Sequence, residues 1–170
     1  MIAPIEVHDL VGAPGTTREV ALSGTIEGLA SELARVPDDA VLQAEVRVES
    51  IVEGLLVSGT IRGTWVLRCA RCLTENEAAF GTEVHEMFAT DPHPEDDIYP
   101  FDPAEGLTLE QMIRDAVGVE MPFSPLCRPD CLGLCEICGG DRNLGACPGH
   151  ERLDPRFAVL SELVLPDLDT

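Results

Sequence analysis

Seven cysteines and one of the four histidines stand in closely spaced pairs, and this spacing constrains the 170-residue chain more than any other feature. The pairs are Cys69-x2-Cys72, Cys127-x3-Cys131, Cys135-x2-Cys138 and Cys147-x2-His150. Ligands paired at short spacing, with glycine or polar residues between them, are typical of structural zinc sites, which take four Cys or His ligands each. Large apolar side chains are few around the later pairs. We therefore predict a Cys-rich zinc-binding lobe over residues 122–150, folded around metal.

The eight ligands can be grouped in two ways. The preferred grouping gives two sites and uses every cysteine: Cys69, Cys72, Cys127 and Cys131 in one, and Cys135, Cys138, Cys147 and His150 in the other. The alternative is a single site made of the contiguous Cys127, Cys131, Cys135 and Cys138, with Cys69 and Cys72 as free thiols. One or two zinc ions per chain are expected accordingly.

Other uses of the cysteines are less favoured. A thioredoxin-like Cys-x-x-Cys begins a helix, but strand-like sequence follows Cys72. A catalytic zinc site of the base-deaminase kind needs His-x-Glu and Pro-Cys-x-x-Cys, and His85-Glu86 has the wrong spacing. Buried cysteines without a ligand are the third alternative. His8 and His93 lack ligand spacing, as His85 does, and we expect all three at the surface.

Charge and composition limit the classes of partner and activity that we expect for the chain. The formal net charge is −20, and all 11 basic residues are arginine. Such an acidic chain repels phosphate backbones over most of its surface and favours basic proteins as partners. The sequence has no span of roughly 20 apolar residues, and its start lacks a basic signal region, so we expect no membrane partner and a cytoplasmic location. Without a nucleophile elbow, a phosphate loop or paired carboxylates, we expect neither an enzyme nor a small-molecule substrate.

The hydrophobic pattern predicts one α+β domain with an antiparallel β meander over residues 41–90. From Leu42 to Val48 apolar residues alternate with polar ones, and the returning strand puts Val57, Ile61 and Trp65 on one face. A third strand should run from about Glu77 to Phe88. Weaker strand signals, at Ile5–Val7 and Val20–Leu22, and a possible short helix over Gly28–Val36 lie in the N-terminal segment, residues 1–40.

The sequence pattern of the C-terminal half predicts the helices of this α+β fold. Residues 91–106 are rich in proline and acidic residues and are expected to form a mobile loop without a regular element, either a connector or a docking strip for a basic partner. An amphipathic helix is predicted over 107–121, with a capping box at Thr108 and Gln111 and an apolar face on the sheet. A second helix is predicted over 151–165, where Asp154-Pro155 resembles a helix start.

One stretch of the meander combines arginines with an aromatic residue. Arg62, Trp65, Arg68 and Arg71 lie close in sequence with no acidic residue among them. They form a candidate RNA-binding patch, because screening limits the repulsion from distant acidic residues. The alternative is that these arginines face solvent or neutralise thiolates.

Several of these motifs resemble the YceD family, named for accumulation of the large ribosomal RNA subunit. The resemblance covers about residues 40–165 and is carried by the following segments: Arg68-Cys-Ala-Arg-Cys-Leu73, Met121 to Gly139, Arg142-Asn-Leu144 and Asp154 to Leu160. It implies a bacterial or plastid protein without established catalytic activity, needed for synthesis, processing or stability of the large-subunit (23S) ribosomal RNA precursor. Relatives often carry a cysteine where this chain has Gly149. Two partners are then expected: the ribosomal RNA precursor, or a basic ribosomal protein held by the acidic surface.

Overall fold

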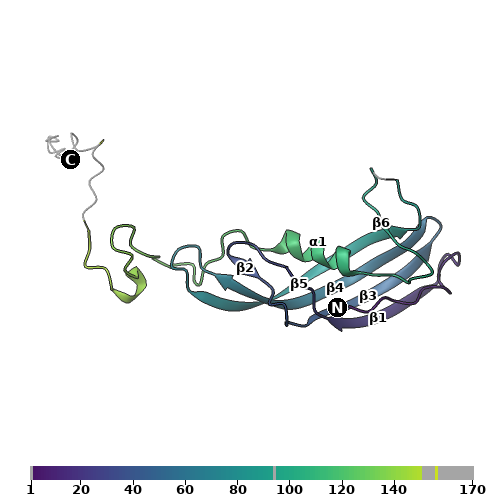
Figure 1. Ribbon diagram of the computed structural model, residues 1–170, viewed down its shortest axis with the longest axis horizontal. Helices are drawn as coiled ribbons and strands as arrows, with labels where there is room; N and C mark the ends of the chain where they lie inside the picture. Colours follow the sequence, from purple (N-terminus) through teal and green to yellow (C-terminus); the bar gives the residue numbers. More distant parts are fainter. Residues whose placement is uncertain (1, 94, 151–155, 157–170) are drawn as a thin grey trace, which may run out of the picture.

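The computed structural model describes residues 2–93, 95–150 and 156, and these form a mostly antiparallel sheet with a helix against one face (Figure 1). The sheet order is β1-β3-β4-β5-β6, and the four long strands are β1 (Thr17–Gly24), β3 (Leu42–Ile51), β4 (Gly54–Arg68) and β5 (Glu75–Ala89). The predicted α+β class and its antiparallel meander are confirmed.

Alternation of apolar and polar residues sets which face of each strand is buried. In β3, every second side chain from Leu42 to Ser50 is buried, and the intervening ones are exposed or half-buried. In β4, Val57, Ile61 and Trp65 face the same core, as the sequence predicted. The opposite face of the sheet is polar and open to solvent, as expected of an antiparallel sheet covered on one side.

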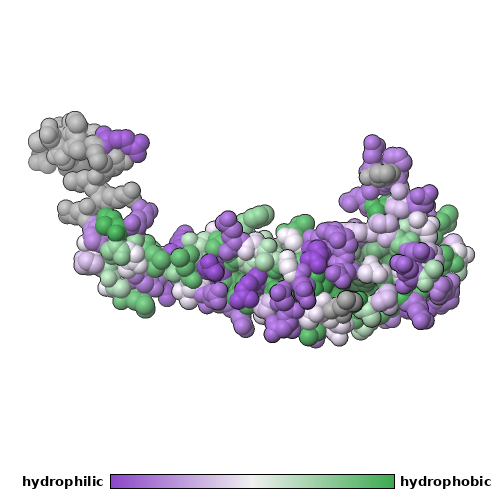
Figure 2. Space-filling view, viewed as in Figure 1, coloured by the Kyte–Doolittle hydropathy of each residue, from purple (hydrophilic) through white to green (hydrophobic). Residues whose placement is uncertain are grey.

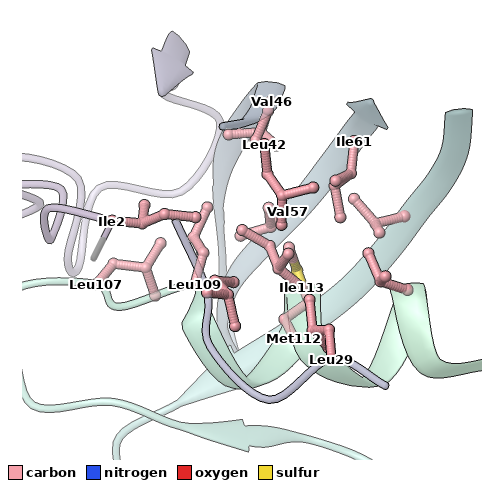
Figure 3. Packing of buried hydrophobic residues seen from close by; sticks show 14 of the residues in the cluster. Ile2, Leu29, Leu42, Val46, Val57, Ile61, Leu107, Leu109, Met112 and Ile113 are labelled. Atoms are coloured by element: carbon pink, nitrogen blue, oxygen red, sulfur yellow. The ribbon is translucent and has the colours of Figure 1, made fainter. Parts of the chain in front are cut away.

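The helix α1 (Glu110–Glu120) supplies the cover of the core. Its buried residues Met112, Ile113 and Val117 form one apolar stripe, which confirms the predicted amphipathic helix. Figure 3 shows side chains of the sheet, of α1 and of the N-terminal segment converging on this core. The predicted capping box is wrong, because the N-cap is Leu109 and no side chain caps the helix.

The N-terminal segment is part of the core, but it does not contain the helix predicted over Gly28–Val36. That span is a turn region followed by the two-residue strand β2 (Ala34–Arg35), which pairs with β4. Gly28 has a left-handed φ of 75°, which interrupts a helix, and Leu29 is buried against the sheet instead. Of the weaker strand signals, Val20–Leu22 lies in β1, and Ile5 makes only an isolated bridge to Leu107.

The acidic segment over residues 91–106 contains one regular element that the sequence did not predict. This is the two-residue strand β6 (Tyr99–Pro100), which pairs in parallel with the end of β5. Its Tyr99 ring stacks on Phe88 at a centroid distance of 5.2 Å, and its hydroxyl donates to Asp115 of α1 at 3.0 Å. A tertiary contact therefore orders two residues whose local sequence favours a loop.

Beyond α1 the chain leaves the sheet and forms the Cys-rich end, which projects from one end of the elongated body (Figure 1). It contains one short 3-10 helix, η1 (Arg142–Leu144). The C-terminal helix predicted over 151–165 lies outside the described residues except at Arg156. No helix in the described part of the chain has the length and apolarity that crossing a membrane requires.

Candidate metal centres

The first cysteine group lies where the longest strand pair ends. β4 stops at Arg68, and the chain reverses through Cys69 and Cys72 before β5 begins at Glu75. The segment after α1 returns to this reversal, because the Ala70 N–H donates to the carbonyl of Pro125 at 2.8 Å. Cysteines 55 or more residues apart in sequence are thereby brought together.

The sulfurs of this group, Cys69, Cys72, Cys127 and Cys131, all lie within 4.8 Å of one another. Cys69 Sγ is 3.8 Å from Cys131 Sγ, and Cys72 Sγ is 3.6 Å from Cys127 Sγ. A disulfide needs about 2.05 Å between its sulfurs. Four sulfurs about 2.3 Å from a tetrahedral zinc ion would stand about 3.8 Å apart, so the donor set fits a thiolate-bound metal ion.

The second group consists of Cys135, Cys138, Cys147 and His150, whose ligand atoms also lie within 4.8 Å of one another. It is more open than the first: Cys138 and His150 are exposed, whereas Cys69 and Cys131 are at most 1% exposed. The structure therefore brings the eight candidate ligands together in the preferred grouping. Cys135 and Cys138 lie with Cys147 and not in the contiguous single site.

Each group is built on a chain reversal with the same hydrogen bonds. The Leu73 N–H donates to the Cys69 carbonyl at 2.9 Å, and the Gly139 N–H donates to the Cys135 carbonyl at 2.8 Å. The first cysteine of each pair donates in turn to the carbonyl five residues later, Thr74 or Gly140, at 2.9 Å. These bonds fold both Cys-x-x-Cys segments so that their two sulfurs face the same point.

The environment of three of the thiols, Cys69, Cys72 and Cys135, lowers their pKa and favours loss of their protons to a metal. Burial raises the pKa of the Cys69 thiol, but backbone N–H groups, among them those of Cys127 and Cys72, outweigh it and bring that pKa down to about 6. Backbone N–H groups of Cys138 and Ile137 lower the pKa of Cys135 to about 7. A cysteine with a lowered pKa supplies the thiolate that binds metal at neutral pH.

The sulfur of Cys127 shows why metal binding would release protons. Its hydrogen bond with Cys72 raises the pKa of Cys127 to about 12, because one sulfur of the pair must hold a proton for the other to share. A divalent ion would replace such shared protons and let all four sulfurs become thiolates.

The Cys-rich end has no apolar core of its own. Among residues 132–150 the only buried position is Gly133, and the large apolar side chains there that stand out at the surface are Leu132, Ile137 and Leu144. Figure 2 shows apolar side chains exposed on this part of the molecule. Hydrophobic burial therefore does not explain its order, and a metal ion held by the cysteine groups would supply the missing constraint.

In the structure, the residues of the candidate RNA-binding patch have surroundings that differ from those expected from the sequence. Trp65 is only 5% exposed, and its ring stacks on Phe80 at 4.1 Å, so it belongs to the core and cannot stack on bases from this position. Arg62 and Arg68 are exposed but pair with Glu45 and Glu75 of neighbouring strands, at 2.7 and 3.9 Å. Strand pairing thus brings carboxylates beside arginines that have no acidic neighbour in the sequence.

Arg71 has a structural contact that the sequence did not predict. Its Nη1 donates to the carbonyl of Cys131 at 2.8 Å, which ties the first reversal to the Cys-rich end. Two further residues were missed. The Thr74 hydroxyl lies 3.3 Å from Cys72 Sγ, and the Asn143 side chain lies 3.5 Å from Cys131 Sγ. Asn143 stands between two ligand pairs in the sequence and within Arg142-Asn-Leu144, one of the segments that carry the family resemblance, and these were the signals that could have found it.

The alternative chemistries find little support in this arrangement. β5 follows Cys72 after a short turn, so the Cys-x-x-Cys does not begin a helix as a thioredoxin-like site does. His85 lies on the exposed face of β5 opposite Ser58, far along the strand from the cysteines. His8 and His93 are also exposed.

Comparison with known proteins finds relatives of the chain in mycobacteria. It is 41% identical over 175 residues to an uncharacterized protein of Mycobacterium tuberculosis (strain ATCC 25618 / H37Rv), covering 99% of this chain and 78% of that protein. An uncharacterized protein of Mycobacterium leprae (strain TN) is 36% identical over 181 residues, covering 99% of this chain and 81% of that protein. No solved structure matches the chain.

A family model described as "Large ribosomal RNA subunit accumulation protein YceD" matches residues 57–164. The matched range takes in most of β4, the whole of β5 and α1, and both cysteine groups. On the evidence of this match, the chain belongs to the YceD family.

Proposed function

We propose that this chain is a non-enzymatic, zinc-binding cytoplasmic factor that supports synthesis, processing or stability of the large-subunit ribosomal RNA. The family match over residues 57–164 carries the proposal, because its description names large ribosomal RNA subunit accumulation. The zinc ions are assigned a structural role: two donor sets of four ligands each leave no open position for substrate or water. Bound zinc would fix the coreless segment against the end of the sheet.

Depletion of the chain in cells of its source organism tests the role directly. The ratio of large-subunit to small-subunit ribosomal RNA should fall, and re-expression of the wild-type chain should restore it. The double variant Cys135→Ser/Cys138→Ser should not restore the ratio, whereas Leu144→Ala, an exposed change in the same segment, should. An unchanged ratio after depletion would refute the proposed role.

Direct contact with the ribosomal RNA precursor is the first candidate for how the chain acts. Among the arginines on the outer face of the sheet, Arg62 and Arg68 belong to the predicted patch, remain exposed and are the side chains we propose for phosphate contact. Arg71 is a poor probe because it also bonds Cys131. Arg62→Glu/Arg68→Glu should therefore weaken binding of precursor RNA more than Arg18→Glu/Arg47→Glu, which changes the net charge equally. Equal effects of the two double variants would show that only overall charge matters.

Holding of a basic ribosomal protein is the second candidate, and charge is the observation that favours it. The chain carries a net −20, and five of its arginines already pair with carboxylates: Arg18, Arg62, Arg68, Arg114 and Arg128. These five cations are partly neutralised toward phosphates, whereas carboxylates are abundant, with 31 acidic residues in the chain. The purified chain should retain a basic ribosomal protein at low salt and release it at high salt. Equal recovery at both salt concentrations would contradict an electrostatic holding role.

A further inference from the structure

We propose that the two cysteine groups bind metal cooperatively and that Asn143 is the positioning residue that couples them. The inference rests on the metal binding proposed above and adds a relation between the sites. Asn143 lies in η1, inside the chain segment closed by Cys138 and Cys147 of the second group. Its side chain nevertheless reaches the first group, with Nδ2 3.5 Å from Cys131 Sγ.

The orientation of the Asn143 amide is fixed by its neighbours. Oδ1 accepts from Arg128 Nη2 and from the Leu132 N–H, both at 2.8 Å. Nδ2 donates to Asp141 Oδ1, also at 2.8 Å. Because the partners of Oδ1 are donors and Asp141 is an acceptor, the flipped amide would lose all three bonds. The N–H side must therefore face the Cys131 sulfur.

Backbone contacts hold the two groups together in the same region. The Leu134 N–H donates to the Arg71 carbonyl at 2.9 Å, and the Arg142 N–H donates to the Gly133 carbonyl at 3.0 Å. Gly133 approaches so closely that a Cβ there would lie 2.9 Å from the Arg71 carbonyl oxygen. The segment that holds the second group is thus docked on the reversal that holds the first.

These contacts make each site depend on the other. An N–H directed at a ligand sulfur offsets part of the thiolate charge and fixes the ligand, and loss of such an outer contact typically lowers metal affinity about 10- to 100-fold. Asn143 can supply that N–H only when residues 139–146 are ordered. Since those residues have no core, metal at the second group orders them and should raise affinity at the first. By linkage, the first metal raises affinity at the second by the same factor.

Titration of the full chain with Co²⁺, followed through its thiolate absorption and by competition with Zn²⁺, tests the coupling. The wild-type chain should bind two ions. The variant Cys135→Ser/Cys138→Ser should bind one ion at the first group, about 10- to 100-fold more weakly than the wild type. Asn143→Ala should still bind two ions but show a comparable loss at the first group. Added to the Cys135→Ser/Cys138→Ser variant, Asn143→Ala should have little further effect.

Two more variants separate a role toward the sulfur from general destabilisation. Asn143→Asp should weaken the first site more than Asn143→Ala does, because a carboxylate would then face both the Cys131 thiolate and Asp141. Leu144→Ala, an 80% exposed neighbour in η1, should stay within about twofold of the wild type.

First-site affinity unchanged in Asn143→Ala would overturn the proposal. So would an equal loss from Asn143→Ala with and without the second group, because the residue would then act without coupling. Binding of no metal by the wild-type chain would instead refute the proposed zinc binding itself.

Discussion

Leu73 and Gly139 occupy the same position in two chain reversals of the same form, and both have a left-handed backbone, with φ of 61° and 69°. Each follows the second cysteine of a Cys-x-x-Cys pair and donates to the carbonyl of the first. Gly139 adopts this conformation without strain, but Leu73 is the one non-glycine residue with positive φ in the described part of the chain. The first reversal is therefore held against a local cost of about 1–2 kcal/mol.

The backbone of the second reversal can be tested at Gly139. No atom lies within 4 Å of a Cβ built there, so Gly139→Ala costs only the left-handed strain, about 1–2 kcal/mol. Because the second site holds this turn, we expect metal affinity there to fall about 5- to 30-fold in chelator competition. Leu73→Gly should lose no affinity at the first site.

A control for Gly139 lies in α1. Gly118 also has open space around a built Cβ but has an ordinary helical backbone, so Gly118→Ala should raise the free energy of unfolding by about 1 kcal/mol. If Gly139→Ala, like Gly118→Ala, caused no destabilisation, the left-handed backbone strain assigned to the second reversal would be absent.

Removal of metal should loosen one part of the molecule only. The buried cysteines Cys69, Cys72 and Cys131 form a cluster separate from the main core. After chelation, hydrogen exchange should lose its protection over residues 127–150, because a structural zinc contributes roughly 10–16 kcal/mol in small lobes. The strands β3 and β4 should stay protected, and the fluorescence of Trp65, the single tryptophan, should change little. Loss of protection across the whole sheet would show that the two parts fold as one unit.

The order of metal loss should follow exposure. Cys138 and His150 of the second group are exposed, while Cys69 and Cys131 of the first are at most 1% exposed. A chelator should therefore reach the second ion first, and stopped-flow removal should show two phases in the wild type. The faster phase should be missing from Cys135→Ser/Cys138→Ser. A single phase in the wild type with the slow rate would contradict this assignment.

Tyr99 provides a pH-dependent test of how β6 is held. Burial, and then its hydrogen bond to Asp115, raises the pKa of Tyr99 to about 12 from an ordinary value near 10. The unfolded chain would lose this proton first, so stability from this group is fully present below about pH 10 and is lost as the pH rises toward 12. Tyr99 is the only tyrosine, so tyrosinate absorbance follows it alone. Asp115→Asn should lower the pKa; an unchanged pKa would show that Asp115 does not contribute.

Close packing above β4 can be tested at Gly63. A Cβ there would lie 2.6 Å from Leu42 Cδ2 and 2.7 Å from Phe80 Cε1, so Gly63→Ala should lower the free energy of unfolding by about 1–3 kcal/mol. Gly81 on the adjacent strand has no atom closer than 3.8 Å to a built Cβ, and Gly81→Ala should be neutral within about 0.5 kcal/mol. Denaturant unfolding of both variants gives the comparison, and equal effects would refute the packing argument.

Local patterns in the sequence were enough to predict the meander, the helix α1 and the ligand pairs. Period-two alternation from Leu42 onward and the apolar stripe of Met112, Ile113 and Val117 follow from the geometry of single strands and helices, so they can be read without knowing the partner. The Cys-x-x-Cys pairs are local in the same sense. Their assignment as metal ligands stays a prediction until metal is measured.

The tertiary structure decided those features that depend on contacts between residues distant in the chain. Tyr99 lies in a strand because its ring stacks on Phe88 and its hydroxyl bonds Asp115. Trp65 is shielded from solvent because it stacks on Phe80. Arg62 pairs with Glu45 because β3 lies beside β4. Asn143 reaches Cys131 only because the segment between two ligand pairs folds back on the first group. Sequence alone determined which residues are candidate metal ligands, whereas folding determined which of them lie in one group, since grouping requires segments from separate parts of the chain to meet.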